Sequence, residues 1–411
     1  MAPQIDPERL LSDLKTLRSF GACGNGVVRQ SFCDVDMAAR RWLAGRMAEA
    51  GLEARIDGVG NVIGRSPNDG RALLMGSHTD TQPRGGWLDG ALGVIYALEV
   101  ARALAGDRSS AHLPLDIASW MDEEGSYLGC LGSASFTEAM GDEVIRRAAN
   151  SVGRSVADAL KAVGLADEAP ARLEPERHRA YLEAHIEQGP VLEAEGKLIG
   201  VVTSIVGVRT LTLTFSGQQN HAGTTPMALR RDAGDALIVL AARLREALGA
   251  LAAERTVFTI GRIVFDPGAD SIIPGRAEMS LQFRDGDEVL LDRMAAAVDR
   301  LMEEANRAGP VRIELAESSH LESAPMDPGL QDHLAAAAER HAPGQWMRMP
   351  SGAAHDAQIF ARRVPSAMLF VPSIGGISHD FAEDTAEADI VLGCQVLASA
   401  AAEILTELNA R

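Results

Sequence analysis

Residues 72–80 read ALLMGSHTD, a mostly apolar run that ends in polar residues. A strand that is apolar on both faces is typical of a parallel sheet covered by helices on both sides. Residues 113–121, LPLDIASWM, form a second such run, and the segment between them, GALGVIYALEVARAL (90–104), has a helical pattern. This alternation predicts an α/β layer with a mostly parallel central sheet.

A different pattern begins near residue 210, where TLTLTF alternates apolar and polar residues. The elements expected after it are a helix around 228–248, strands at 256–265 and 277–284, a helix at 288–308 and a strand at 311–315. The order β-α-β-β-α-β is that of the split, ferredoxin-like unit. We therefore expect a small domain, residues 210–323, inserted into a discontinuous large domain, residues 1–209 and 324–411.

The composition restricts the class of protein. A chain of 411 residues exceeds the usual size of one hydrophobic core, which again favours two domains. The net charge of −18 disfavours nucleic acid and anionic membranes as partners, because both would be repelled. We find no signal peptide and no run of about 20 apolar residues, and the four cysteines show no CxxC pair, so we expect a cytoplasmic protein.

Polar residues gather where the predicted strands end. His78 and Asp80 lie two apart on one face of a strand, so Asp80 can accept a hydrogen bond from the far imidazole nitrogen. Each such residue alone is more commonly structural or solvated. Together, histidines and carboxylates suit one or two divalent cations and do not choose among zinc, manganese and cobalt. The further members of this set are Asp89, Glu123, Glu124, His185, Glu187 and His379.

The stretch WMDEEG, residues 120–125, places three acids at the end of a strand. If Glu124 binds a metal, Glu123 is held nearby without being a ligand and can serve as a general base. Asp122 has no role in this interpretation.

Six stretches carry a resemblance to a known family: GSHTDTQPRGGWLDGALGV (76–94), DEEGSYLGCLGS (122–133), EAHIEQGPVLE (183–193), NHAGTTPM (220–227), PSGAAHDAQ (350–358) and GGISHD (375–380). The chain resembles the M20 metallopeptidase-like amidohydrolases, in the branch of N-carbamoyl-L-amino acid hydrolases and allantoate amidohydrolases. The resemblance implies that the large domain is catalytic and binds metal, and that the small one is a lid and dimerisation domain. It also implies a homodimer.

The resemblance assigns a dinuclear centre of two divalent cations, zinc, manganese, cobalt or nickel. Asp89 would bridge the cations, Glu123 would be the general base, and Asp80 would support His78. The peptide after Asp89 is often cis in this family. The implied ligands are His78, Asp89, Glu124, His185 and His379.

The resemblance also assigns residues to the substrate. His221 would polarise the scissile carbonyl and stabilise the oxyanion, and it could do so in the partner subunit's site. Arg284 would grip a substrate carboxylate together with an asparagine. This chain has Ser271 where relatives have that asparagine. Gln188 is expected to contact the substrate.

Three further departures from the family pattern lie near the expected N-acyl end of the substrate. Ala354 precedes His355, itself a candidate substrate-binding residue, where glycine is usual, and Asp380 and Phe381 follow His379 where relatives often have Asn or Ser and then Pro.

The expected activity is metal-dependent hydrolysis of an amide or ureido C–N bond in an N-carbamoyl-L-amino acid or a similar small molecule with a carboxylate. Three alternatives stay open. They are an allantoate amidohydrolase, an N-acyl-amino acid amidohydrolase or dipeptidase with the same centre, and a metal-binding module without catalysis.

Overall fold

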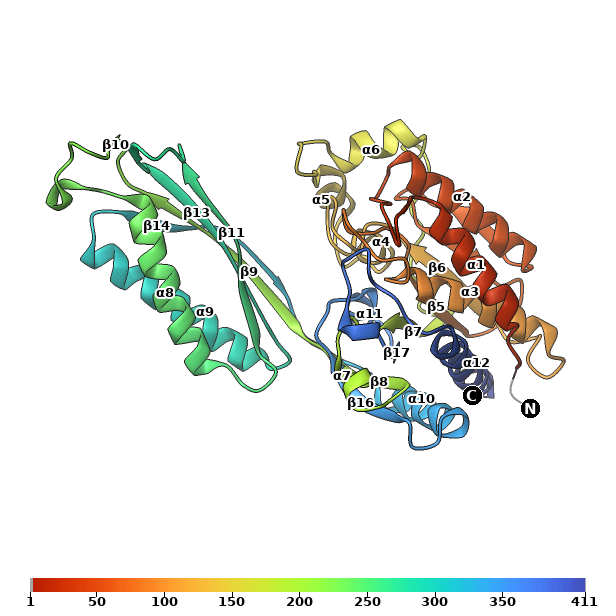
Figure 1. The fold of residues 1–411 in the computed structure, drawn as a ribbon. Helices are drawn as coiled ribbons and strands as arrows, with labels where there is room; N and C mark the ends of the chain where they lie inside the picture. The colour runs from red at the N-terminus through yellow and green to blue at the C-terminus, as the bar shows by residue number, and fades with distance from the viewer. Residues whose placement is uncertain (1–2, 411) are drawn as a thin grey trace. The chain divides into compact units, whose positions relative to one another are not determined.

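The computed structural model describes residues 3–410 and consists of two compact units (Figure 1). The first runs to Ser204 and resumes at Pro325, and the second is Ile205–Ala324. The sequence predicted the insertion at 210–323, but its first long strand already begins at Gly207.

The first unit is built on a mixed sheet with the strand order β15-β8-β17-β7-β5-β6-β4-β3, and β16 pairs with β8. The central strands β17, β7, β5 and β6 are parallel, whereas β8, β4 and β3 pair antiparallel with their neighbours. The sheet is therefore mixed, where the sequence predicted a mostly parallel one. Its strands are β3 (Glu53–Ile56), β4 (Val62–Arg65), β5 (Ala72–His78), β6 (Leu115–Trp120), β7 (His178–Ile186), β8 (Ile199–Ile205), β15 (Ala324–Pro325), β16 (Trp346–Ser351) and β17 (Ser366–Val371).

Helices such as α3, α10 and α12 pack against the sheet of the first unit. The α3 helix is buried along nearly its whole length, as expected for a helix that is apolar on every side. The helices of this unit are α1 (Pro7–Ser19), α2 (Asp34–Glu49), α3 (Ala91–Gly106), α4 (Leu131–Phe136), α5 (Asp142–Arg147), α6 (Val156–Val163), α7 (Val191–Ala194), α10 (Pro328–His341), α11 (Asp356–Phe360) and α12 (Glu387–Ala410), with a 3-10 turn η2 at Ile374–Gly376 and a hairpin of β1 (Ala22–Cys23) and β2 (Gly26–Val27).

The α12 helix is the one helix in the described residues that is long and apolar enough to cross a membrane. However, 61% of its most apolar window is buried inside the structure. Residues such as Ile390, Leu397 and Leu405 belong to the same core as α3 and α10. Packing in this core accounts for its composition.

The second unit is an antiparallel sheet with the strand order β11-β13-β9-β14. Its elements are β9 (Gly207–Ser216), β10 (Asn220–His221), η1 (Met227–Leu229), α8 (Ala233–Leu251), β11 (Val257–Asp266), β12 (Ile272–Ile273), β13 (Arg276–Asp285), α9 (Glu288–Ala308) and β14 (Arg312–Leu321). Helices α8 and α9 lie side by side against this sheet (Figure 1). Their apolar stripes, which include Leu240 and Met294, form a core with strand residues such as Leu213.

Candidate metal centre

The candidate ligands of the first unit lie at the carboxyl ends of neighbouring parallel strands. His78 is the last residue of β5, and His185 is the last but one of β7. Glu123 and Glu124 follow β6, which pairs with β5 on its other side. In an open α/β sheet this edge is the usual place for a ligand site.

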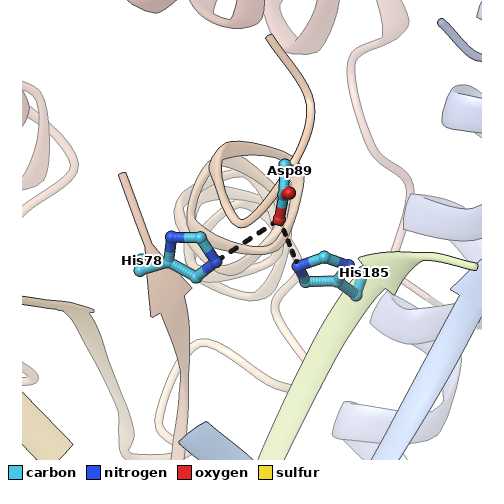
Figure 2. A group of neighbouring side chains, drawn as sticks. All are labelled: His78, Asp89 and His185. Atoms are coloured by element: carbon cyan, nitrogen blue, oxygen red, sulfur yellow. Dashed lines mark ion pairs between the residues drawn. The ribbon is translucent and has the colours of Figure 1, made fainter. Parts of the chain in front are cut away.

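The first group consists of His78, Asp89 and His185, all at most 3% exposed. The Asp89 Oδ1 atom lies 3.5 Å from His78 Nε2 and 3.1 Å from His185 Nε2. Figure 2 shows both rings turned toward this one carboxylate. His78 and His185, more than one hundred positions apart in the sequence, thus meet at Asp89, and the three side chains present three possible metal ligands to one point.

The other nitrogen of each ring contacts the backbone. His78 Nδ1 lies 3.1 Å from the carbonyl oxygen of Asp80, and His185 Nδ1 lies 2.9 Å from that of Ile186. A neutral imidazole that donates from Nδ1 carries its lone pair on Nε2. In that tautomer the Nε2 atoms of both rings are free to bind a cation held by Asp89, and the backbone N–H of Gly90 lies 3.0 Å from His185 Nε2. A divalent cation fits this donor set.

Asp80 supports His78 through its backbone, which corrects the expectation that its carboxylate would do so. The carboxylate Oδ1 is 3.8 Å from His78 Nδ1, beyond hydrogen-bond distance. Oδ2 instead accepts a hydrogen bond from the Glu124 backbone N–H at 3.2 Å and lies 3.1 Å from Ser31 Oγ.

The second group consists of Asp89, Glu124 and His379. Asp89 Oδ2 lies 3.3 Å from His379 Nε2, and Glu124 Oε2 lies 3.8 Å from the same nitrogen. The Gln188 amide donates to Asp89 Oδ2 at 3.0 Å, so this predicted substrate residue contacts a candidate ligand. The His379 side chain is 51% exposed, which makes the second group the more open one.

Charge is crowded at this centre. Burial alone would lower the pKa of His78, but the negative charges of Glu123 and Asp89 outweigh it and raise that pKa well above its ordinary value. Burial and the charge of Asp89 raise the pKa of Glu124 to about 7. Burial also raises the pKa of Glu123, against the effect of His78. Buried carboxylates in this number favour cations among them.

Glu123 occupies a place beside the first group. Its Oε2 atom is 3.5 Å from His78 Nε2, and Cys130 Sγ donates weakly to its Oε1 at 3.9 Å. The side chain therefore reaches the centre, while no hydrogen bond or ion pair joins it to Asp89 or His379. This position is compatible with the predicted general base.

The loop that carries Asp89 turns at Gly90, which has φ +64° and ψ −46°. A Cβ atom there would lie 2.4 Å from the His78 ring. Within residues 3–410 the one cis peptide is Asp266–Pro267, so the cis peptide expected after Asp89 is not found. The positive φ that glycine permits makes the turn instead.

Two buried carboxylates of this region have roles that the sequence did not predict. Asp122 accepts a hydrogen bond from Ser31 Oγ at 2.7 Å and from the backbone of Tyr127 and Leu128 at 2.9 and 2.7 Å, so it holds the loop after β6. Glu383 accepts from the backbone of Asp89 at 3.0 Å. An acid in a loop gives no signal of such a contact in the sequence.

Residues expected at the N-acyl end of the substrate have structural contacts. His355 is 2% exposed, with its ring centroid 4.6 Å from that of His185 and its Nε2 3.0 Å from Ser351 Oγ. The Phe381 ring lies over Gly26, where a Cβ atom would approach it to 2.5 Å. Packing against this glycine explains why a phenylalanine fits at this position.

The second unit brings His221 and Ser271 together and separates both from Arg284. The short strands β10 and β12 pair His221 with Ile272, and Ala222 donates to the carbonyl oxygen of Ser271 at 3.0 Å. These residues lie beyond the Arg276 end of β13, whereas Arg284 is near its other end. At about 3.3 Å per residue, Arg276 and Arg284 are roughly 26 Å apart.

Within one chain, Ser271 and Arg284 are therefore too far apart to grip one carboxylate together. A small substrate cannot reach both. The length of β13, which the motifs do not reveal, is the physical reason.

The fold and the centre define an α/β protein with two adjoining groups of possible cation ligands on one sheet edge. Residues 74–403 match Peptidase family M20/M25/M40. Since the match spans most of the chain, the protein belongs to this family.

Two named relatives and one solved structure are similar to this chain over nearly its full length. The chain is 36% identical to the N-carbamoyl-L-amino-acid amidohydrolase of Paenarthrobacter aurescens, over 95% of this chain and 96% of the relative. It is 35% identical to the allantoate amidohydrolase of Escherichia coli strain K12, over 94% and 95% of the two chains. A crystal structure of an amidase of the hydantoinase/carbamoylase family from Burkholderia phymatum is 56% identical, with a TM-score of 0.87 over 99% of this chain and 100% of the other.

Proposed function

We propose that this chain is an amidohydrolase that cleaves the ureido C–N bond of an N-carbamoyl-L-amino acid or a similar ureido acid. The observation that carries the proposal is the Asp89 carboxylate, whose two oxygens face histidine nitrogens of two different groups. The named amidohydrolase relatives, similar over nearly the full chain, support the same activity.

The residues present fit a centre of two divalent cations. His78 and His185 would hold one cation with Asp89, and Glu124 and His379 would hold the other. Bound there, the cations would supply Lewis acidity to the scissile carbonyl and to the attacking water. Zinc, manganese, cobalt and nickel all accept this donor set.

Glu123 supplies the proton transfers of the proposed reaction. Its carboxylate takes a proton from the attacking water and later gives it to the leaving nitrogen. With an N-carbamoyl amino acid the products are the free amino acid and carbamate, which decomposes to carbon dioxide and ammonia.

His221 is the proposed oxyanion donor. Its Nδ1 accepts hydrogen bonds from the backbone N–H groups of Gly223 at 2.9 Å and Thr224 at 3.2 Å. With Nδ1 as the acceptor, a neutral ring carries its proton on Nε2. This exposed N–H is then available to stabilise a developing negative charge.

We further propose that the enzyme is a homodimer in which the second unit acts as lid and dimerisation domain. His221 and Arg284 lie at opposite ends of their unit, so one chain cannot offer both to one small substrate. A second copy supplies the missing residue, and Arg284 grips the carboxylate. The outer strands β11 and β14 expose apolar side chains such as Ile263 and Leu315, which suits pairing between copies.

Allantoate is the second candidate substrate, because a relative named for it matches this chain almost equally well. It shares the ureido group and a carboxylate with the first candidate, so the described centre suits both. Cytoplasmic location and an N-acyl or dipeptide substrate remain predictions from the sequence.

A substrate panel tests the proposal. Protein loaded with manganese or zinc is given N-carbamoyl, N-formyl and N-acyl L-amino acids, dipeptides and allantoate, and release of ammonia and of the free amino acid is followed. We expect turnover of ureido compounds above all others. Turnover of N-acyl compounds or dipeptides alone would refute the ureido specificity, and metal binding without any turnover would favour a non-catalytic module.

A further inference from the structure

Glu383 is a buried carboxylate in the segment between β17 and α12, with 1% exposure. Its Oε1 accepts hydrogen bonds from the backbone N–H groups of Leu88 at 3.1 Å and Asp89 at 3.0 Å. Its Oε2 accepts one from Ser378 Oγ at 2.8 Å. One side chain therefore joins the loop that carries Asp89 to the residue that precedes His379.

The surrounding residues permit this close approach. At Gly86, a Cβ atom would lie 1.8 Å from Glu383 Oε1, so only glycine leaves room for the carboxylate at the loop. Trp87 Nε1 donates to Asp384 Oδ1 at 3.3 Å and gives a second link between the same two segments. This second link touches neither Asp89 nor Ser378.

The two groups of candidate ligands differ in their other supports. In the first group, both imidazole rings are buried and each has its Nδ1 against a backbone carbonyl. In the second group, His379 lies in a loop with φ +55° and is half exposed, and the side-chain contact of its Nε2 with a residue that is not a candidate ligand is to the Gln188 amide at 3.3 Å, which also donates to Asp89. The distance between Asp89 and His379 thus depends on what holds their two loops together.

We propose that Glu383 is a positioning residue that fixes the spacing of Asp89 and His379 and so determines the affinity of the second cation site. The inference rests on the proposed two-cation centre. Supports of this kind around metal ligands commonly change metal affinity by about 10- to 100-fold when removed. Because the first group has its own supports, the loss should fall on one of the two cations.

The test compares three variants with the wild-type protein by calorimetric titration of the metal-free chains with manganese or zinc, and by metal analysis after dialysis. Glu383→Ala removes all three hydrogen bonds. Glu383→Gln keeps an oxygen for the two backbone N–H groups and offers its amide to Ser378 Oγ. Trp87→Phe removes the neighbouring link and is the matched control.

We expect two cations on the wild type, on Glu383→Gln and on Trp87→Phe. In Glu383→Ala we expect one cation to bind as in the wild type and the other about 10- to 100-fold more weakly. If Glu383→Ala does not fold, Ser378→Ala, which breaks only the link to the His379 loop, takes its place with the same expected loss.

Two cations of unchanged affinity in the alanine variant, or equal weakening of both, would overturn the inference. A wild-type protein that binds fewer than two cations would instead refute the proposed centre, so the two failures are distinguishable.

Discussion

Asp89 belongs to both groups of candidate ligands, since its Oδ1 points to His78 and His185 and its Oδ2 points to His379. Burial alone would raise the pKa of this carboxyl, but its three histidine neighbours, His185, His379 and His78, hold it well below its usual value. The side chain is therefore an anion that needs positive charge on two sides. Its position depends on the turn at the next residue.

Gly90→Ala should disturb the first group. The new Cβ would lie 2.4 Å from the His78 ring, and φ +64° is unfavourable for alanine. We expect a loss of stability of about 1–3 kcal/mol and weaker binding of at least one cation. Thermal unfolding and metal titration measure both effects.

Gly90 caps the start of α3, and Gly106 is the last residue of that helix. Gly106→Ala is therefore the matched control for Gly90→Ala. A Cβ atom at this position would have no neighbouring atom within 4 Å. It should leave metal binding unchanged. Wild-type cation affinities in Gly90→Ala would contradict the described role of the turn.

At the scale of elements, the two ends of the parallel strands carry different groups of polar residues. The carboxyl ends of β5, β6 and β7 carry the candidate centre, whereas an ion cluster ties the amino ends of β6 and β7 together. Asp116 of β6 accepts two hydrogen bonds from Arg177, at 2.7 and 2.8 Å, and lies 3.1 Å from His178 Nε2. Burial would raise the pKa of Asp116, but these partners lower it to about 2.

Asp116→Asn should reduce stability in a pH-dependent way. The carboxyl has a pKa of about 2 in the fold and an ordinary value of 3.8, so it stabilises the fold above pH 3.8, and this contribution is lost as the pH falls toward 2. Its size is on the order of 2 kcal/mol.

Denaturant unfolding from pH 7 to pH 2 should show the variant less stable at neutral pH and less sensitive to acid. Asp167→Asn, at an exposed position, controls for the change in net charge. A variant whose stability follows the wild-type curve would contradict this account of the cluster.

The sequence predicted the central strands and the polar residues at their ends, but not the contact of Glu383 or the antiparallel edges of the sheet. Apolar runs that end in His78 and before Glu123 and Glu124 indicated both the strands and the residues at their ends, because strand burial and strand ends have a local signature. Glu383 has no such signature, since Glu383 and Asp384 are adjacent loop acids and only the fold places Glu383 against the Asp89 backbone. The antiparallel edges of the sheet, at β4 and β8, likewise depend on pairing between distant segments.

At the scale of the whole molecule, the two units each hold part of the predicted machinery. The motifs could predict that His221, Ser271 and Arg284 matter but not that β13 separates Arg284 from the other two, because spacing along a strand converts into distance only once its length is known. The separation is the basis of the proposed homodimer.

Mixed dimers of Arg284→Met and His221→Ala test this arrangement. Each variant alone should be nearly inactive. In a mixed dimer, one site would receive both altered residues and the other would receive both native ones. Random assortment should then restore about a quarter of wild-type activity, because half of the dimers are mixed and each has one intact site of two.

Gel filtration with light scattering checks that mixing has produced dimers. No recovery of activity in such a mixture would show that each chain completes its own site, against the proposed sharing.

The central claim is that the chain hydrolyses its substrate at a cation centre with Glu123 as the base. The most direct measurement is ureido hydrolysis by Glu123→Gln together with its metal content. We predict a fall in rate of about 10²- to 10⁴-fold with the bound metal per chain unchanged. Hydrolysis at the wild-type rate in this variant would contradict the account.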